Sequence, residues 1–322
     1  MKKIKLEDVA SYANVSPTTV SRVINNRGSI SDKTRKKVTQ AMEDLGYYPN
    51  EIARSLYGKK TNSIGILFPD LMNPFFGEMT TKLEHLLSEK DYKVLICNTQ
   101  NNLEKETNYL KMLLANQVDG IIVGSHNKPS EIYQQAHLPI VSIDRYVSNK
   151  VPIVRSDNYN GARTATNYLL EKGCEKIALI SGSSLIEIQQ GDQRVQGYLD
   201  IMKENNLCPI SYHVEFDKPI EYQKKKIDEF LKKYQKVDGI FATGDSIASL
   251  LFHAAKKMKR DIEIVGYDGT EFITNYFNNF ATIKQPIDRM AEKSIQLLLE
   301  FIDGDYSHSG KEFLFDTELI EP

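Results

Sequence analysis

Residues 6–26, LEDVASYANVSPTTVSRVINN, decide the fold of the N-terminal part of the chain. Apolar residues recur at i, i+3, i+4 and i+7 in its first half, as on one face of an amphipathic helix: Leu6, Val9, Ala10 and Ala13. Asn14 and Ser16 then mark a tight turn, in which asparagine tolerates a left-handed backbone. Ser16 is a favoured N-cap and Pro17 suits the first helical position, so a second helix is predicted through residue 24.

A third helix is predicted in residues 34–45, with Ser31 as its N-cap and Gly46 at its end. No strand pattern interrupts these three helical segments. We therefore predict an all-α helix-turn-helix head in residues 1–49. Residues 50–61 form a linker that contains one short helix.

The charge is distributed unevenly along the chain. Residues 1–60 hold 12 Lys and Arg against 6 Asp and Glu, whereas the remaining residues hold 29 against 37. A basic head joined to an acidic body is the pattern expected when only the head approaches a polyanion such as DNA.

From residue 62 to residue 322 the pattern changes to apolar strands that alternate with amphipathic helices. The predicted strands are residues 64–68, 93–97, 120–123, 140–143, 176–181, 239–242 and 263–267. Such alternation builds doubly wound, mostly parallel sheets, and the length favours two Rossmann-like subdomains with a cleft between them. We assign residues 62–157 and 287–310 to the first subdomain, and residues 158–286 and 311–322 to the second.

Several classes of protein are disfavoured by the sequence. Apolar runs are too short for a membrane span, and Glu7 and Asp8 interrupt the basic start before a signal-peptide core develops, so we expect a cytoplasmic protein. The three cysteines are widely spaced and read as reduced structural residues. Histidines show no metal-ligand spacing, and no nucleotide-binding loop or catalytic set is found. We expect no cofactor, no metal and no catalysis.

The helix-turn-helix stretch resembles the opening of LacI/GalR-family repressors. The resemblance continues through PNEIARSL (residues 49–56), which is similar to the family's hinge helix. It extends into the body through GILFPDLMNPFF, VDGIIV, SIDR, IVGYDG and TIKQP, and within the family it is greatest to repressors of sucrose-utilisation operons. The resemblance implies a periplasmic-binding-protein-like body, a homodimer, double-stranded operator DNA as partner and a small sugar, sucrose or fructose-like, as effector.

The second helix carries the residues expected to contact DNA. Arg22 can donate two parallel hydrogen bonds to a guanine, and Thr18 lies near the helix N-terminus, where base-reading residues are usual. The others suit phosphates: Ser16, Pro17, Thr19, Ser21 and Asn25. The alternative for Arg22 is a solvated surface arginine.

The short linker helix places Ala53 and Leu56 at i and i+3. So short a helix is marginal alone in water. The resemblance implies that two hinge helices fold together on DNA and insert Leu56 into the minor groove, which requires a dimer and a near-palindromic operator. The alternative is that Leu56 packs on the body.

Residues that follow the strands of the body are candidates for sugar binding, because ligands of such sheets lie beyond the carboxyl ends of the strands. Carboxylates, amides, an arginine and an aromatic ring suit a polyol. The candidates are Asp70, Asn73, Phe75, Ser125, Asp144, Arg194, Asp245, Asp268 and Gln285. The resemblance places Asp268 and Arg194 at effector-contact positions. Asp144 could instead pair with Arg145, and Phe75 could pack in the core.

Four other functions compete with a sugar-responsive repressor. A periplasmic sugar-binding protein would share the body but not the head, and an enzyme would need a catalytic set. A regulator that responds to a phosphoprotein, or to a purine corepressor, remains open within the family. The residues alone do not distinguish inducer from corepressor, and induction follows only from the subfamily resemblance. No leucine heptad follows residue 316, so we expect a dimer.

Overall fold

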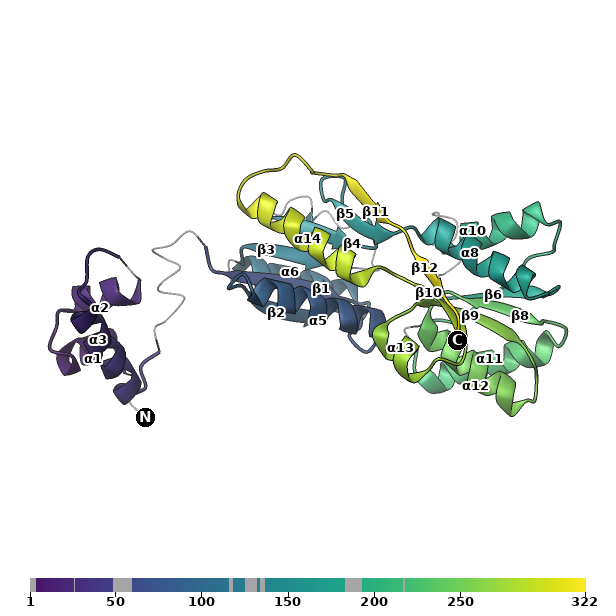
Figure 1. The fold of residues 1–322 in the computed structure, drawn as a ribbon, viewed down its shortest axis with the longest axis horizontal. Coiled ribbons are helices and arrows are strands. Elements are labelled where there is room, and N and C mark those ends of the chain that lie inside the picture. The colour runs from purple at the N-terminus through teal and green to yellow at the C-terminus, as the bar shows by residue number, and fades with distance from the viewer. Residues whose placement is uncertain are drawn as a thin grey trace. The chain divides into compact units, whose positions relative to one another are not determined.

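The computed structural model describes residues 4–25, 27–48, 60–115, 118–124, 132–133, 137–182, 193–216 and 218–322. The chain divides into two compact units, Met1–Thr61 and Asn62–Pro322 (Figure 1). Ala53, Leu56 and Ser125, which we predicted as contact residues, lie outside the described residues.

The first unit contains the three predicted helices, α1 (Leu6–Tyr12), α2 (Pro17–Ile24) and α3 (Asp32–Leu45). The Ser16 hydroxyl accepts a hydrogen bond from the Thr19 amide, which confirms the predicted N-cap of α2. Asn14 has the predicted left-handed backbone, with φ 49°. A small apolar core joins the helices: Val9, Ala10, Ala13, Val20, Val23, Val38 and Ala41.

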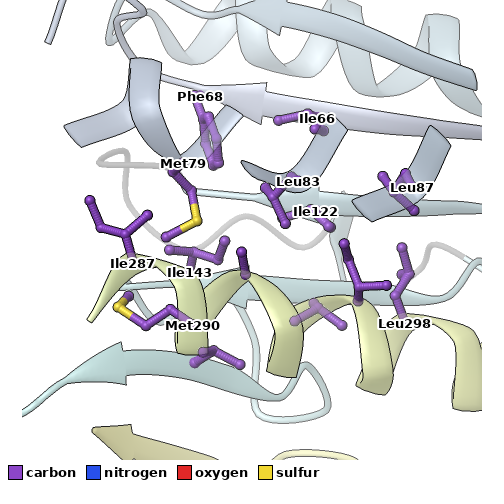
Figure 2. Close-up of a cluster of buried hydrophobic side chains, with 14 of the residues drawn as sticks. Ile66, Phe68, Met79, Leu83, Leu87, Ile122, Ile143, Ile287, Met290 and Leu298 are labelled. Carbon is purple, nitrogen blue, oxygen red and sulfur yellow. The ribbon is translucent and has the colours of Figure 1, made fainter. Parts of the chain in front are cut away.

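The second unit begins with a parallel sheet in the order β11-β5-β4-β3-β1-β2. Its strands are β1 (Ser63–Phe68), β2 (Lys93–Asn98), β3 (Gly120–Val123), β4 (Ile140–Ile143), β5 (Ile153–Ser156) and β11 (Glu312–Phe315). Helices α5 (Pro74–Ser88) and α14 (Ile287–Ile302) cover one face, where Figure 2 shows their side chains meeting over the strands. Helix α6 (Leu103–Ala115) covers the other face. Adjacent Ile66 and Leu67 belong to opposite cores, as strand alternation requires.

The second sheet has the order β12-β10-β9-β8-β6-β7, with β12 antiparallel. Its strands are β6 (Ile177–Ser181), β7 (Ile210–His213), β8 (Gly239–Ala242), β9 (Glu263–Asp268), β10 (Ala281–Lys284) and β12 (Glu318–Ile320). Helices α8 (Asn158–Glu171) and α10 (Gln193–Glu204) pack on one face. The other face is covered by α11 (Ile220–Lys233), α12 (Asp245–Lys257) and α13 (Glu271–Tyr276).

The chain crosses between the two sheets three times, after β5, after β10 and after β11 (Figure 1). Our assignment of residues 311–322 to the second subdomain was wrong for residues 312–315. These residues form β11, which pairs in parallel with β5 of the first sheet. Phe313 and Phe315 pack against the core of that sheet, and their burial holds the strand there.

Candidate DNA-reading helix and effector site

Helix α2 buries one side and exposes the other. Val20 and Val23 lie in the core of the head, while Thr18 and Arg22 are exposed. These two exposed residues are four positions apart and therefore lie on one helix face. The face presents a short hydroxyl and a guanidinium, which can enter a major groove together.

The remaining predicted contact residues of α2 occupy its two ends. At the N-terminus Ser16 caps the helix and Pro17 occupies its first position, and the Ser16 and Thr19 hydroxyl oxygens lie 2.9 Å apart. At the C-terminus the Asn25 amide donates to the Ser21 carbonyl at 2.8 Å. These side chains thus hold the helix ends while remaining at its surface or partly buried.

Asp268 and Arg194 form a charged centre in the second subdomain. Asp268 is the last residue of β9 and has a positive φ of 113°, so the regular strand backbone ends there. Arg194 is the second residue of α10, and its Nη1 lies 3.7 Å from Asp268 Oδ1. Arg194 Nη1 also donates to the Thr243 carbonyl at 2.8 Å. The structure therefore brings together the two residues that the resemblance singled out.

Burial governs the acidity of Asp268. Removal from water raises the pKa of its carboxyl to about 6, although Arg194 and Gln285 both oppose this rise. Asp144 adds to the increase through charge repulsion. Asp268 is thus poised to change its ionisation just below neutral pH.

Two aromatic rings border this centre. The Arg194 guanidinium lies over the Tyr267 ring, 3.8 Å from its centroid, which is close enough for a cation–π contact. The Phe216 ring packs on Gly182 and Gly244, where added Cβ atoms would lie 2.5 Å and 3.5 Å from it. The Gly244 position would also lie 3.9 Å from Asp268 Oδ2. Phe216 therefore borders the centre. It was not predicted from the sequence, because β7, which precedes it, was not predicted either.

Asp144 and Gln285 reach the centre through hydrogen bonds. Asp144 Oδ1 accepts from the Asn158 amide at 3.1 Å, and Asn158 Oδ1 accepts from Arg194 Nε at 2.8 Å. Gln285 Nε2 donates to Asp268 Oδ1 at 2.8 Å. Asp144 also lies 3.8 Å from Arg145 Nε, so the ion pair considered from the sequence is present.

Asp245 lies next to the centre but faces the protein interior. Its side chain accepts hydrogen bonds from the Gly269 amide at 2.7 Å and from the Thr282 hydroxyl at 2.6 Å, and the residue is 1% exposed. Burial and the nearby Asp268 raise the pKa of its carboxyl well above the ordinary range. This geometry supports a role in holding the Gly269 turn.

Three of the candidates from the first subdomain, at the start of α5, are engaged locally. Asp70 accepts from the Met72 amide at 3.0 Å, and Asn73 caps α5 by accepting from the Phe75 amide at 3.0 Å. Phe75 is 3% exposed and belongs to the hydrophobic core, the alternative considered for it. These residues shape the start of α5.

The described residues were also compared with the requirements of a metal site, a membrane span and a disulfide, and none of these features is present among them. The described residues contain no group of three His, Cys, Asp or Glu side chains that could hold a metal. Among those residues, no helix is long and apolar enough to cross a membrane. All three cysteines are free; Cys97 and Cys174 are buried, whereas Cys208 is exposed.

Known proteins resemble both units of this chain. The bacterial regulatory proteins of the lacI family match residues 5–50. The periplasmic binding proteins and sugar binding domain of the LacI family match residues 61–293.

Individual relatives extend the match over nearly the whole length. The sucrose operon repressor of Pediococcus pentosaceus is 42% identical over 99% of this chain and 98% of its own. That of Lactococcus lactis subsp. lactis is 42% identical over 94% of each. A crystal structure of the lac repressor dimer bound to operator and the anti-inducer ONPF superposes with a TM-score of 0.84 at 26% identity, over 99% of this chain and 98% of that one. This chain therefore belongs to the LacI family of bacterial regulatory proteins.

Proposed function

We propose that this chain represses a bacterial sucrose-utilisation operon: α2 binds operator DNA, and a sugar that binds beside Arg194 and Asp268 releases it. The observation that carries the proposal is the similarity to sucrose operon repressors over both the head and the body. A chain that shares both units with such repressors has the parts for reading DNA and for sensing a ligand.

The charge and the exposed face of α2 support the DNA-binding half. The basic head suits phosphate contacts, which supply affinity but little sequence information. Arg22 and Thr18 supply the contacts to base edges, where sequence is read.

The charged centre supports the sugar-binding half. A buried carboxylate and a guanidinium make charge-assisted hydrogen bonds to hydroxyl groups, and these are about twice as strong as neutral ones. The Phe216 ring offers an apolar face for a sugar ring. A phosphorylated sugar would bring further negative charge toward Asp268 and Asp144, so we favour an unphosphorylated sugar.

The sugar is bound and released unchanged in this proposal. The centre supplies hydrogen bonds and charge, and nothing in its arrangement suggests a nucleophile oriented by a base. We place the protein in the cytoplasm, because that is where a bacterial operator is found.

A homodimer is required, because two symmetric half-sites need two symmetric heads. We propose that a patch of exposed apolar residues on the body contributes to the dimer contact. Met72 and Phe272 line a groove of about 670 Å³, and the Tyr276 ring lies 5.6 Å from the Phe272 ring. Exposed apolar patches of this kind commonly mark protein interfaces.

Release of DNA requires that the sugar bind the low-affinity form of the repressor more tightly than the DNA-bound form. A coupling free energy of about 1–3 kcal/mol is typical of such linkage. The sugar therefore acts as an inducer by shifting the population between two forms of the body.

The test is an operator gel shift titrated with sucrose, fructose and their phosphorylated forms. We expect sucrose or fructose to release the operator, and the phosphorylated sugars to be weaker. Release by none of these compounds would contradict the proposal. A response to a purine or to a phosphoprotein instead would show that the effector is not a sugar.

A further inference from the structure

Two buried amide side chains connect the charged centre to the first subdomain. Gln285 lies between β10 and α14, on one of the three crossovers, and is 1% exposed. Its Oε1 accepts a hydrogen bond from the Ser156 hydroxyl, and its Nε2 donates to Asp268. Ser156 ends β5 of the first sheet. The chain Ser156–Gln285–Asp268 therefore runs from one sheet to the other.

Asn158 makes the second connection. It is the first residue of α8, directly after the crossover that follows β5, and is 7% exposed. Its Nδ2 donates to Asp144 at the end of β4, and its Oδ1 accepts from Arg194. The chain Asp144–Asn158–Arg194 thus also joins the first subdomain to the second.

The hydrogen bonds of these amides suit a role in linking the charged centre to the first subdomain better than direct contact with a ligand. Each side-chain amide donates through its nitrogen and accepts through its oxygen. The partner of one atom therefore fixes the orientation in which the other atom meets its own partner. Both residues are buried, and both of their ends are engaged within the protein. In a low-dielectric interior, breaking one such bond leaves a polar group unpaired and is costly.

We infer that Gln285 and Asn158 are coupling residues, which transmit the state of the Asp268–Arg194 centre to two of the three crossovers between the subdomains. This inference rests on the proposed function. A sugar hydroxyl that binds Asp268 or Arg194 redirects the bonds that these residues make to the amides. The change passes through the amides, which lie on the crossovers, to Ser156 and Asp144 in the first subdomain, and closure between domains is absorbed at a few such connecting residues.

Three variants of similar size remove one or both of the hydrogen bonds in these two chains. Asn158→Asp keeps the oxygen that accepts from Arg194 but loses the N–H that donates to Asp144. Ser156→Ala removes the hydroxyl that bonds Gln285 and leaves Gln285 in contact with Asp268. Gln285→Met, of similar volume, removes both bonds. Gln296→Leu is the matched control, because that exposed amide on α14 bonds only side chains of its own helix, Lys293 and Glu300.

The experiment measures operator affinity by fluorescence anisotropy with and without saturating sucrose, and sucrose affinity by calorimetry. We expect each variant to bind operator, and, at sucrose concentrations that saturate that variant, we expect the ratio of operator Kd values with and without sucrose to fall about 2- to 30-fold below wild type. The Gln296→Leu control should keep the wild-type ratio. Ser156→Ala and Gln285→Met should not be additive, because they cut the same chain.

Two results would overturn the inference. If the variants keep the wild-type ratio, the amides do not couple the sites. If they weaken sucrose binding while operator release stays proportional to sucrose occupancy as in the wild type, they are sugar contacts and not coupling residues. A wild-type protein that ignores sucrose and fructose altogether would instead contradict the proposed function, so the two failures are distinguishable.

Discussion

Burial and charge meet at Asp268, the residue that we propose as a sugar contact. Its carboxyl has a pKa of about 6 in the folded protein, against an ordinary value of 3.8. A hydroxyl that donates a hydrogen bond to this carboxylate favours the ionised form. Sugar binding and proton loss are therefore linked at one atom group.

The linkage predicts how sugar affinity depends on pH. We expect sucrose affinity to be greatest above about pH 6 and to fall as the pH drops through that value, measured by calorimetry between about pH 5 and about pH 8. The stability of the sugar-free protein should depend on pH in the opposite direction. Its folded state binds a proton that the unfolded chain releases between pH 3.8 and about 6, so its stability falls as the pH rises through this window.

Asp268→Asn is the control for this prediction. The amide cannot titrate, so the dependence of sucrose affinity on pH near 6 should disappear, whereas the stability of the variant still depends on pH through Asp245, whose pKa burial also raises. Equal sucrose affinity of the wild-type protein at about pH 5 and about pH 8 would show that Asp268 is not the linked group.

Arg22 carries the corresponding prediction for DNA. Arg22→Ala should cost about 1–3 kcal/mol per half-site and relax base preference, because it removes a bidentate guanine contact. Operator and random duplexes are compared by anisotropy at a fixed salt concentration. Lys36→Ala, an exposed cation on α3, should leave the ratio of the two affinities unchanged. The assigned readout is wrong if Arg22→Ala also preserves that ratio.

The residue types of the effector centre could be predicted, but their individual roles could not. Polar residues follow each strand, so the sequence named Asp245 and Asp268 alike. Their roles differ because Asp268 turns at φ 113°, whereas Asp245 begins α12 and bonds the Gly269 amide inside the protein. A backbone turn and a partner distant in sequence decide this, and neither is visible in a local pattern.

At the scale of elements, strong local signals predicted the head well. The N-cap at Ser16, Pro17 at the first helical position and the left-handed Asn14 all recur in the structure. The strands of the body that begin with or consist of apolar runs were also predicted, including β3, β4 and β8, which are buried along their whole length. The strands β5, β7, β10, β11 and β12 were missed, since they are only partly buried and depend on pairing with their neighbours.

The short hinge helix predicted in the linker lies wholly outside the described residues, and its prediction rests on sequence. Leu56→Ala should weaken operator binding and reduce DNA bending, because the side chain is expected to unstack a base step. Circular-permutation mobility measures the bend, and sucrose affinity serves as the control that should not change. An unaltered bend angle would show that Leu56 does not act as a wedge.

At the scale of the whole molecule, the sequence predicted two subdomains but misplaced one crossover. The return of β11 to the first sheet depends on Phe313 and Phe315 finding that core, a contact between segments about half the chain apart. Two of the three crossovers carry the amides that bond the charged centre. The proposed sugar contacts and the connections between the subdomains thus lie within a few residues of each other.

We propose that sugar and operator binding are thermodynamically linked in one molecule. Each ligand must then change the affinity for the other by the same factor, and measuring both changes tests the linkage. Calorimetry gives the sucrose Kd with and without bound operator, and anisotropy gives the operator Kd with and without sucrose. The account predicts that both ratios equal one factor, about 5 to 150, and that Asp268→Asn abolishes the effect of sucrose on operator binding while the operator is still bound. A sucrose Kd that is the same with and without operator would contradict it.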